Sequence, residues 1–416
     1  MAQEIFFLIL GAILGTIFNF IPKWYRSLIK LLNSKKAQNR KVFLENNSAI
    51  YDWLIQYYTE NSNDLFNCRI ANYEIKIPFL TKPEWLYYSP MPQNDDILLD
   101  YTETNNQKFP IETNLIRMRK ELGQVLFDNP ALYLDRIEEN ESSLTLHVKS
   151  CDYFQIASSF ISLEEETFKA VQKNSYKHLK IRDSYISRVS QVQGLIKKPF
   201  AIGCAVALAL KTKDSYELLI HTRSHAAVTF GGAKGVTPNF GLAPLTGGVR
   251  TIFSDSDFSL GSNRGYNLLY YNFIKEFLEE LYNYEELIEL VSNRKANPFW
   301  FYNLHEAEKL LHLIEQGSFS LEFLGFGFDA LNGNAIIALL GVINEEKYSV
   351  ELKNNLELNW EIAKKKDVLA FEFVDIKSDK LERWLRDNKY HTGAAFTISR
   401  ALKRLNAPNA FTTPSV

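Results

Sequence analysis

Residues 261–283 read GSNRGYNLLYYNFIKEFLEELYN, and the interpretation of the rest of the chain depends on them. On an α-helix, residues three and four positions apart share a face, so Glu276, Glu279 and Glu280 gather in one narrow sector. Apolar side chains gather on the opposite side, namely Ile274, Phe277, Leu278 and Leu281. The sequence therefore predicts an amphipathic helix that buries one stripe in a core and presents three carboxylates to solvent or to a cleft.

This acidic triplet has two interpretations. Like charges at helical spacings of three and four cost about 0.2–0.5 kcal/mol per pair, so a bound cation would stabilise the helix. Hard divalent ions such as magnesium prefer oxygen ligands, and a bound ion holds phosphate oxygens or activates a water. Alternatively, the three acids form a solvated face, which is the interpretation that suits Glu285, Glu286 and Glu289 just downstream. Spacing alone does not decide between these two interpretations.

The wider pattern around the triplet resembles the Nudix box. In that box a Gly, a Glu and an Arg-Glu-x-x-Glu-Glu segment follow one another at fixed spacings, which Gly261, Asn267 and Lys275–Glu280 reproduce without a gap. The sequence departs from the box where Asn267 replaces the first Glu and Lys275 replaces the Arg. Tyr282 and Asn283 also replace the closing Gly and hydrophobic residue. These departures affect the geometry of the loop and helix more than the acids themselves.

The residues before the box support the resemblance. Two apolar runs, 200–210 and 216–223, predict buried strands, and the second is similar to a strand that Nudix domains carry at this point. A Gly-rich segment at 228–235 is similar to the turn that usually leads into the box, but an insertion at 236–260 separates the two. Such a turn lets backbone amides approach phosphate, and the residues expected to bind it are Gly231, Gly232, Lys234 and Arg250. The alternative is that the glycines only form a hairpin turn.

The resemblance implies an α/β fold, a Nudix-like α/β/α sandwich with a mixed sheet. It also implies magnesium- or manganese-dependent hydrolysis of a nucleoside diphosphate derivative, a pyrophosphohydrolase activity. Glu276, Glu279 and Glu280 would then be both the catalytic and the metal-binding residues, holding the ions or orienting the water. Two alternatives stay open: a catalytically degraded domain that binds a nucleotide without cleaving it, and a scaffold that binds neither nucleotide nor metal.

The segments after the box predict the strands and helices that such a sandwich needs. Asn332-Gly333 is a strong hairpin signal between two apolar runs. The predicted elements are a helix at 303–316, strands at 320–331, 334–343 and 367–376, and helices at 378–387 and 392–405. The Nudix-like domain is therefore expected to span residues 196–406, followed by a tail at 407–416.

Residues 45–195 predict an α+β accessory region. Alternating apolar residues favour strands near 73–77 and 144–148, and helical spacing favours a helix at 113–127. Ser162-Leu-Glu-Glu165 resembles a capping box that opens a helix running to about Leu179. The region contains no pattern of side chains typical of a catalytic site.

The N-terminal segment predicts a membrane anchor. An apolar run within residues 1–22 reaches the lower limit for spanning a bilayer, and the following segment, 23–44, is rich in Lys and Arg. By the positive-inside rule this places the body after a single-pass helix in the cytoplasm, and the cations would attract anionic lipid headgroups. Gly11 and Gly15 fit a helix-pairing motif, so homodimerisation through the anchor is one alternative, and ordinary membrane glycines are the other.

A membrane anchor, an α+β region and a divergent Nudix domain together resemble the Nudix proteins associated with SMODS-type nucleotidyltransferases in bacterial anti-phage systems. The resemblance implies an effector in the bacterial inner membrane that responds to a nucleotide or a cyclic nucleotide. A formal net charge of −2 gives no electrostatic reason to expect nucleic acid as a partner. Hydrophobic residues make up 46% of the chain and charged residues 23%, which is typical of a globular body.

Overall fold

The computed structural model describes the chain from residue 47 to residue 406 with gaps. The described residues are 47–62, 64–70, 73–91, 97–102, 108–121, 124, 126–140, 143–177, 179–192, 194–223, 232–244, 264–284, 300–357 and 371–406. The predicted anchor, basic linker and tail lie outside them, as do Gly231 and Arg250. Among the described helices, none combines the length and the apolar character that a bilayer crossing requires.

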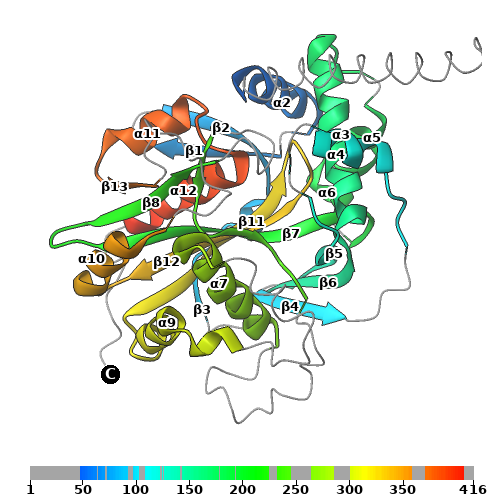
Figure 1. The fold of residues 1–416 in the computed structure, drawn as a ribbon. Helices are drawn as coiled ribbons and strands as arrows, with labels where there is room; N and C mark the ends of the chain where they lie inside the picture. The colour runs from blue at the N-terminus through cyan, green and yellow to red at the C-terminus, as the bar shows by residue number, and fades with distance from the viewer. Residues whose placement is uncertain are drawn as a thin grey trace, which may run out of the picture.

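Helices and strands alternate along the described chain (Figure 1). The helices are α2 (Asn47–Asn61), η1 (Pro83–Trp85), α3 (Thr113–Glu121), α4 (Tyr153–Gln172), α5 (Lys180–Tyr185), α6 (Val189–Val192), α7 (Arg264–Tyr282), η3 (Trp300–Asn303), α9 (His305–Glu315), α10 (Glu346–Asn355), α11 (Asp379–Arg386) and α12 (Thr392–Leu405). The strands are β1 (Leu65–Ile70), β2 (Tyr73–Leu80), β3 (Ser89–Met91), β4 (Ile97–Thr102), β5 (Pro130–Glu139), β6 (Leu144–Asp152), β7 (Gly194–Lys211), β8 (Tyr216–Thr222), β9 (Lys234–Val236), β10 (Asn239–Gly241), β11 (Phe319–Asp329), β12 (Ala335–Ile343) and β13 (Phe371–Asp375).

The long strand β7 connects the strands into one mixed network. Its second half pairs in parallel with β12, from Ile202 opposite Ala335 to Leu210 opposite Ile343. It also pairs antiparallel with β5, β8 and β10, while β12 continues through β11 to β2. Parallel and antiparallel pairs therefore occur in the same sheet, and the described residues form a mixed α/β protein with a curled sheet (Figure 1).

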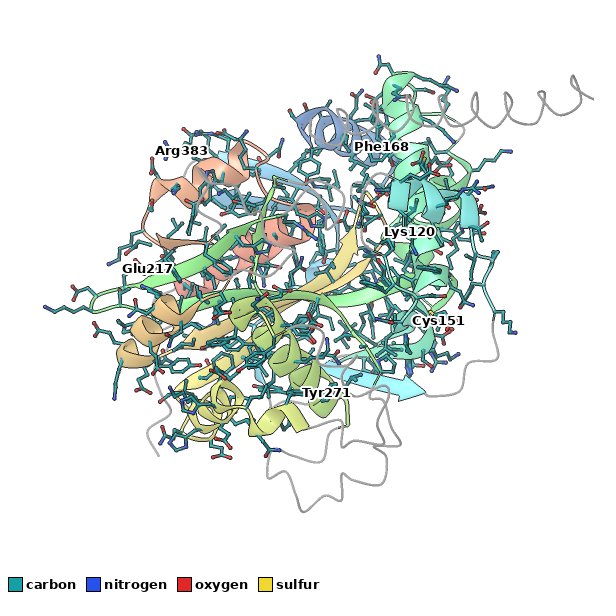
Figure 2. All side chains as sticks on the ribbon, in the orientation of Figure 1. Lys120, Cys151, Phe168, Glu217, Tyr271 and Arg383 are labelled. Carbon is teal, nitrogen blue, oxygen red and sulfur yellow. The ribbon has the colours of Figure 1, made fainter. Side chains whose placement is uncertain are left out.

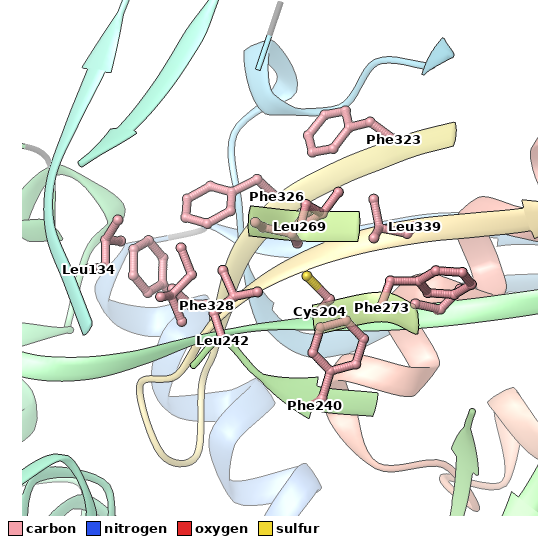
Figure 3. Close-up of a cluster of buried hydrophobic side chains, with 14 of the residues drawn as sticks. Leu134, Cys204, Phe240, Leu242, Leu269, Phe273, Phe323, Phe326, Phe328 and Leu339 are labelled. Atoms are coloured by element: carbon pink, nitrogen blue, oxygen red, sulfur yellow. The ribbon is translucent and has the colours of Figure 1, made fainter. Parts of the chain in front are cut away.

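Alternate residues of β7 belong to two different hydrophobic cores. Cys204, Val206 and Leu208 belong to the first core, together with the apolar residues of α7 and α9. The alternating alanines, from Ala205 to Ala209, belong to the second core, together with residues of α11 and α12. Because successive side chains of a strand point to opposite faces, α7 and α9 cover one face of the sheet and α11 and α12 cover the other (Figure 1). Figure 3 shows part of the first core, where Leu269 and Phe273 of α7 lie with Cys204.

Most elements predicted after the box are confirmed. The last predicted helix coincides with α12 (Thr392–Leu405), and the helix predicted at 303–316 corresponds to α9. α9 ends shortly before Gly317, which has a positive φ of 71°. The predicted hairpin turn joins β11 to β12, and Gly333 has a positive φ of 79°. Glycine is the residue that adopts this conformation without steric cost.

The capping-box prediction at Ser162 is wrong. Ser162 lies inside α4, which begins at Tyr153, and its hydroxyl donates to the carbonyl of Ser158 at 2.5 Å within the helix. The helix instead starts after Asp152, where the Phe154 amide donates to the Asp128 carboxylate at 2.8 Å. The Ser-x-x-Glu pattern is present at Ser162, but the mostly apolar residues before it are also helical, so α4 begins nine residues earlier, at Tyr153. The helix also ends at Gln172, earlier than Leu179.

The boundary expected between the accessory region and the box domain, at 195/196, falls inside β7. Apolar residues from both sides of that boundary belong to the first core. The buried guanidinium of Arg182 also joins the two sides, since it donates to Tyr58 at 2.6 Å, to Thr167 at 2.6 Å and to the carbonyl of Leu331 at 3.0 Å. The two regions are therefore packed as one unit.

Candidate functional site

The acidic helix α7 is buried on both of its faces. The predicted apolar stripe is confirmed, because Ile274, Phe277, Leu278 and Leu281 are all 1% exposed or less. Two of the three acids are covered too, with Glu279 only 8% exposed and Glu280 only 6% exposed, while the Glu276 side chain is 17% exposed. Tyr271 lies on the same helix (Figure 2). Its ring packs against that of Phe301, with the ring centroids 5.4 Å apart. The interpretation of the triplet as a solvated face is therefore wrong.

Lys275 lies between two of the three acids. Its ammonium is 2.8 Å from Oε1 of Glu276 and 2.8 Å from Oε2 of Glu279. Burial disfavours the charged lysine, but the two carboxylates outweigh burial and raise the pKa of Lys275 above its ordinary value. The ammonium therefore stays charged at physiological pH and neutralises part of the charge of the triplet.

Glu280, the third acid, joins α7 to the neighbouring strand. Its Oε1 accepts a hydrogen bond of 3.1 Å from the backbone amide of Asn239, the first residue of β10. Asn239 lies opposite Ala205 on β7. Glu280 is therefore hydrogen-bonded to a strand that pairs directly with the central strand β7. A carboxylate that accepts a hydrogen bond from a partly buried backbone amide satisfies a donor that would otherwise lack a partner. Glu280 therefore has a structural contact in place.

Asn272 makes a second polar contact between α7 and the same segment, and the sequence pattern did not predict this contact. Its Oδ1 accepts from the amide of Ala243 at 3.0 Å, and its Nδ2 donates to the carbonyl of Ala243 at 3.1 Å. Nδ2 also donates to the carbonyl of Leu268 at 2.9 Å. Asn272 is fully buried. The signal was an amide residue within the apolar run of the helix, between Tyr271 and Phe273.

The Gly-rich turn is described from Gly232 onward. Gly232 has a positive φ of 88°, and its amide donates to the carbonyl of Arg223 at 2.9 Å, next to the end of β8 and the start of β9. Gly235 packs against the ring of His221, because a Cβ at this position would lie 2.6 Å from the ring. Backbone conformation at Gly232 and close packing at Gly235 therefore explain why glycine occupies these positions, without a bound phosphate. Phosphate binding by Gly231, Gly232 and their neighbours stays a prediction.

Lys234 lies on the opposite side of the sheet from the acids. Its ammonium forms an ion pair with Glu372 of β13, donates to Thr222 at 3.0 Å and lies 4.7 Å from the ring centroid of Trp384. Trp384 packs against the second core, whereas α7 belongs to the first. The structure therefore does not bring Lys234 together with the acidic triplet. The side chain of Asn267, the other departure from the box, lies outside the described residues.

A buried polar cluster at the start of α12 was not predicted as a group. His391 Nε2 lies 3.5 Å from Oδ2 of Asp329, which also accepts a hydrogen bond from Thr392. Burial raises the pKa of Asp329 to about 6. Burial and the nearby Arg223 lower the pKa of His391 to about 3.

His221, on β8, lies near this cluster. Its Nδ1 is hydrogen-bonded to Thr237, and burial, Arg223 and Lys234 lower its pKa to about 3. Both His221 and His391 are therefore neutral at physiological pH. His221 is therefore a buried, hydrogen-bonded residue of the sheet.

The arrangement of α7 does not fit a divalent cation. The Lys275 ammonium contacts two of the carboxylates, and a backbone amide contacts the third. Within the described residues, no group of three or more His, Cys, Asp and Glu side chains is placed to hold a metal ion. Magnesium or manganese binding after a rearrangement of these side chains stays a prediction.

A cavity of about 320 Å³ lies elsewhere, between the end of α2 and α6. Its lining residues are Asn61, Ser62, Asp64, Lys82, Arg188, Val189 and Ser190. None of the predicted site residues is among them.

Comparisons with known proteins do not assign the chain to a family. A scan against models of protein families finds no match, and a search of curated proteins finds no similar sequence.

Proposed function

We propose that this chain is a membrane-anchored effector whose Nudix-like domain binds a nucleotide without cleaving it. Three observations support the likeness to Nudix domains: the spacing of the box, the mixed sheet, and helices on both faces of that sheet with the acidic helix on one of them. The observation that carries the choice of binding over cleavage is the position of Lys275 between Glu276 and Glu279.

Cleavage of a nucleoside diphosphate derivative by a Nudix-type site requires carboxylates that are free to hold magnesium or manganese and to orient a water. In α7, two carboxylates and the ammonium of Lys275 form a buried ion-paired group, and Glu280 accepts from Asn239. Separating a buried ion pair leaves an uncompensated charge, which costs about 3–5 kcal/mol. A metal ion would have to overcome this cost before it could bind.

The Gly-rich turn and the acidic helix meet on one short segment. The turn at Gly232 leads into β9, and the chain continues to β10, whose first amide is bound by Glu280. A ligand that binds the Gly-rich segment therefore acts on residues that are hydrogen-bonded to α7. This is the route by which a bound nucleotide or cyclic nucleotide would be sensed by the body of the protein.

The anchor and the basic linker complete the proposal. Residues 1–22 would hold the protein in the bacterial inner membrane with its body in the cytoplasm, and the cations of 23–44 would bind anionic lipids. Ligand binding would then switch an effector at the membrane, with pairing of anchors through Gly11 and Gly15 as a route to assembly. The resemblance to the Nudix proteins associated with SMODS-type nucleotidyltransferases makes anti-phage signalling the biological setting of this proposal.

The test uses the full chain in detergent micelles, with NAD, ADP-ribose, dinucleoside polyphosphates and cyclic oligonucleotides as ligands. Product formation and the unfolding temperature are measured on the same samples, with magnesium or manganese present. We expect one ligand class to raise the unfolding temperature without any product, because a ligand that binds only the folded state stabilises it. No stabilisation by any ligand would contradict the proposal.

Hydrolysis is the second candidate, because all three acids of the box are retained on one helix. In that case, the same assay would show a product that requires magnesium or manganese. Glu279→Gln and Glu280→Gln would abolish product formation while the protein stays folded. That result would replace the binding proposal by a hydrolase with a rearranged metal site.

A further inference from the structure

We infer that the cavity between the end of α2 and α6 binds a small phosphate ester that carries a hydroxyl group, with the guanidinium of Arg188 as the main contact to the phosphate. The cavity has a volume of about 320 Å³, a size typical of sites for small molecules. All of its lining residues precede residue 196, where the Nudix-like domain is expected to begin. The inference is therefore independent of nucleotide binding at the Gly-rich segment.

The cavity lies where three segments that are far apart in the sequence meet, namely the end of α2, the residue before η1 and the start of α6. Asp64 joins these segments. Its backbone carbonyl accepts a hydrogen bond of 3.1 Å from the amide of Thr81, and its Oδ2 accepts one of 2.8 Å from the amide of Val189. The walls are therefore held in position before a ligand binds, which lowers the entropic cost of binding.

Arg188 supplies a cation whose donors are all available. Its side chain is exposed, so a ligand can reach it from solvent. Within the described part of the chain, its guanidinium makes no hydrogen bond or ion pair. The planar group carries five N–H donors in a fork that matches two oxygens of a phosphate. Arg188 can therefore bind a phosphate without first giving up a contact.

Lys82 adds a second cationic side chain, in a fixed position. Its Nζ donates to the two carboxylate oxygens of Glu139 at 3.0 and 3.2 Å and lies 5.3 Å from the ring centroid of Trp85. An ammonium has three N–H donors, so one of them remains for a ligand. Because Glu139 balances the charge of Lys82, Lys82 contributes a hydrogen bond rather than net charge.

Hydroxyl groups complete the set of donors. Ser62 and Ser190 both line the cavity. The hydroxyl oxygen of Ser62 accepts from the amide of Asp64 at 3.4 Å, so its own proton remains to be donated. Together with Arg188 and Lys82, these serines suit the tetrahedral oxygens of a phosphate better than the planar pair of a carboxylate.

Acceptors in the same cavity favour a ligand that also carries a hydroxyl group. Asp64 uses Oδ2 for the amide of Val189, and its Oδ1 makes no hydrogen bond with a described residue. Asn61 donates through Nδ2 to the carbonyl of Tyr57 at 2.7 Å, which leaves its Oδ1 as an acceptor. A hydroxyl beside the phosphate would donate to one of these oxygens, whereas a bare phosphate would only be repelled by the carboxylate of Asp64.

Two sources offer this chemistry, and the experiment separates them. Glycerol 3-phosphate is the soluble probe, phosphatidylglycerol in mixed micelles is the lipid probe, and inorganic phosphate lacks the hydroxyl-bearing carbon chain. Isothermal titration calorimetry measures the affinity of each probe for the full-length protein in detergent. The proteins are wild type, Arg188→Met, Arg188→Lys and the control Arg69→Met. Arg69 is also exposed and without a described ion pair, but it does not line the cavity.

We expect wild type to bind glycerol 3-phosphate or phosphatidylglycerol, and whichever binds identifies the source of the phosphate ester. Arg188→Met should weaken this binding at least about tenfold. Arg188→Lys should weaken it less, because it keeps the charge and loses the fork. Arg69→Met should bind like wild type. The unfolding temperature without ligand should be the same in all four proteins, which shows that the loss of affinity does not come from unfolding.

Three outcomes overturn the inference. The first is a wild-type protein that binds neither glycerol 3-phosphate nor phosphatidylglycerol. The second is equal affinity of wild type and Arg188→Met, or an equal loss in Arg69→Met, since the binding would then take place elsewhere. The third is inorganic phosphate that binds as tightly as the phosphate ester, which would contradict the selection of a hydroxyl group by Asp64 and Asn61.

Discussion

Single buried residues set the response of this protein to pH. The pKa values of His221 and His391 are lowered from the ordinary value of 6.5 to about 3. Between pH 3 and pH 6.5, each histidine is therefore neutral in the folded protein and protonated in the unfolded chain. Their contribution to stability is complete above pH 6.5 and is lost as the pH falls toward 3. Asp329 acts in the opposite direction, because its pKa is raised to about 6. Its contribution is present below its ordinary pKa of 3.8 and is lost as the pH rises through 6.

The first prediction concerns His391→Gln. Between about pH 4 and pH 6, two histidines favour proton uptake on unfolding and one aspartate favours proton release, so the cluster gives a net uptake of about one proton. Removing one histidine should leave the cluster nearly balanced. The free energy of unfolding, measured by denaturant titration at several pH values, should therefore depend less steeply on pH in the variant. An unchanged pH dependence would show that His391 is not held neutral by burial.

The second prediction concerns Gly235, whose Cβ would overlap the ring of His221. Gly235→Ala should destabilise the protein by about 1–3 kcal/mol, because the buried ring has to shift. Gly241→Ala is the matched control, since a Cβ there meets no atom within 4 Å. Chemical denaturation of both variants measures the difference. Equal stability of the two variants would contradict the packing of His221 against Gly235.

At the scale of elements, α7 shows what a helical pattern reveals and what it does not. The spacing of apolar residues predicted the stripe from Ile274 to Leu281, because burial follows the period of the helix. The pairing of Lys275 with Glu279 is also local, at a separation of four residues. The contact of Glu280 with Asn239 and the cover over the acidic face are not local, and no periodicity of α7 encodes them.

The third prediction concerns the polar contact between α7 and the segment after β10. Asn272→Ala removes three hydrogen bonds and leaves the partly buried backbone amide and carbonyl of Ala243 without this partner. The cost should be about 2–4 kcal/mol. Asn355→Ala, at the exposed end of α10, is the control and should change stability by less than about 0.5 kcal/mol. A small effect of Asn272→Ala would mean that apolar packing alone positions the helix.

At the scale of the whole molecule, the division into an accessory region and a box domain does not match the packing. The strands and helices after the box were largely predictable from local patterns, whereas α2, β1, β4 and β5 of the accessory region were not predicted and the helix expected at 113–127 ends at Glu121. The union of the two regions was not predictable, because it depends on the length of β7 and on long-range contacts of Arg182 with Tyr58 and Leu331. Positions that are far apart in the sequence carry no periodic signal of their contact.

The fourth prediction follows from this union. The described body should unfold in one cooperative calorimetric transition, and Arg182→Met should lower the temperature of that single transition because buried carbonyl and hydroxyl groups lose their donor. Arg188→Met, at an exposed position nearby in the sequence, should have little effect. Two separate transitions in the wild-type protein, only one of them moved by Arg182→Met, would show that the regions fold independently.

We propose that the domain resembling the Nudix fold binds a nucleotide and that its acidic helix does so without a metal ion. The most direct measurement is the ligand-induced rise in unfolding temperature of the full chain, with product analysis, in buffer containing either magnesium or a chelator. We expect the same rise in both buffers and no product in either. A product that forms only with magnesium and disappears in Glu279→Gln would contradict this proposal.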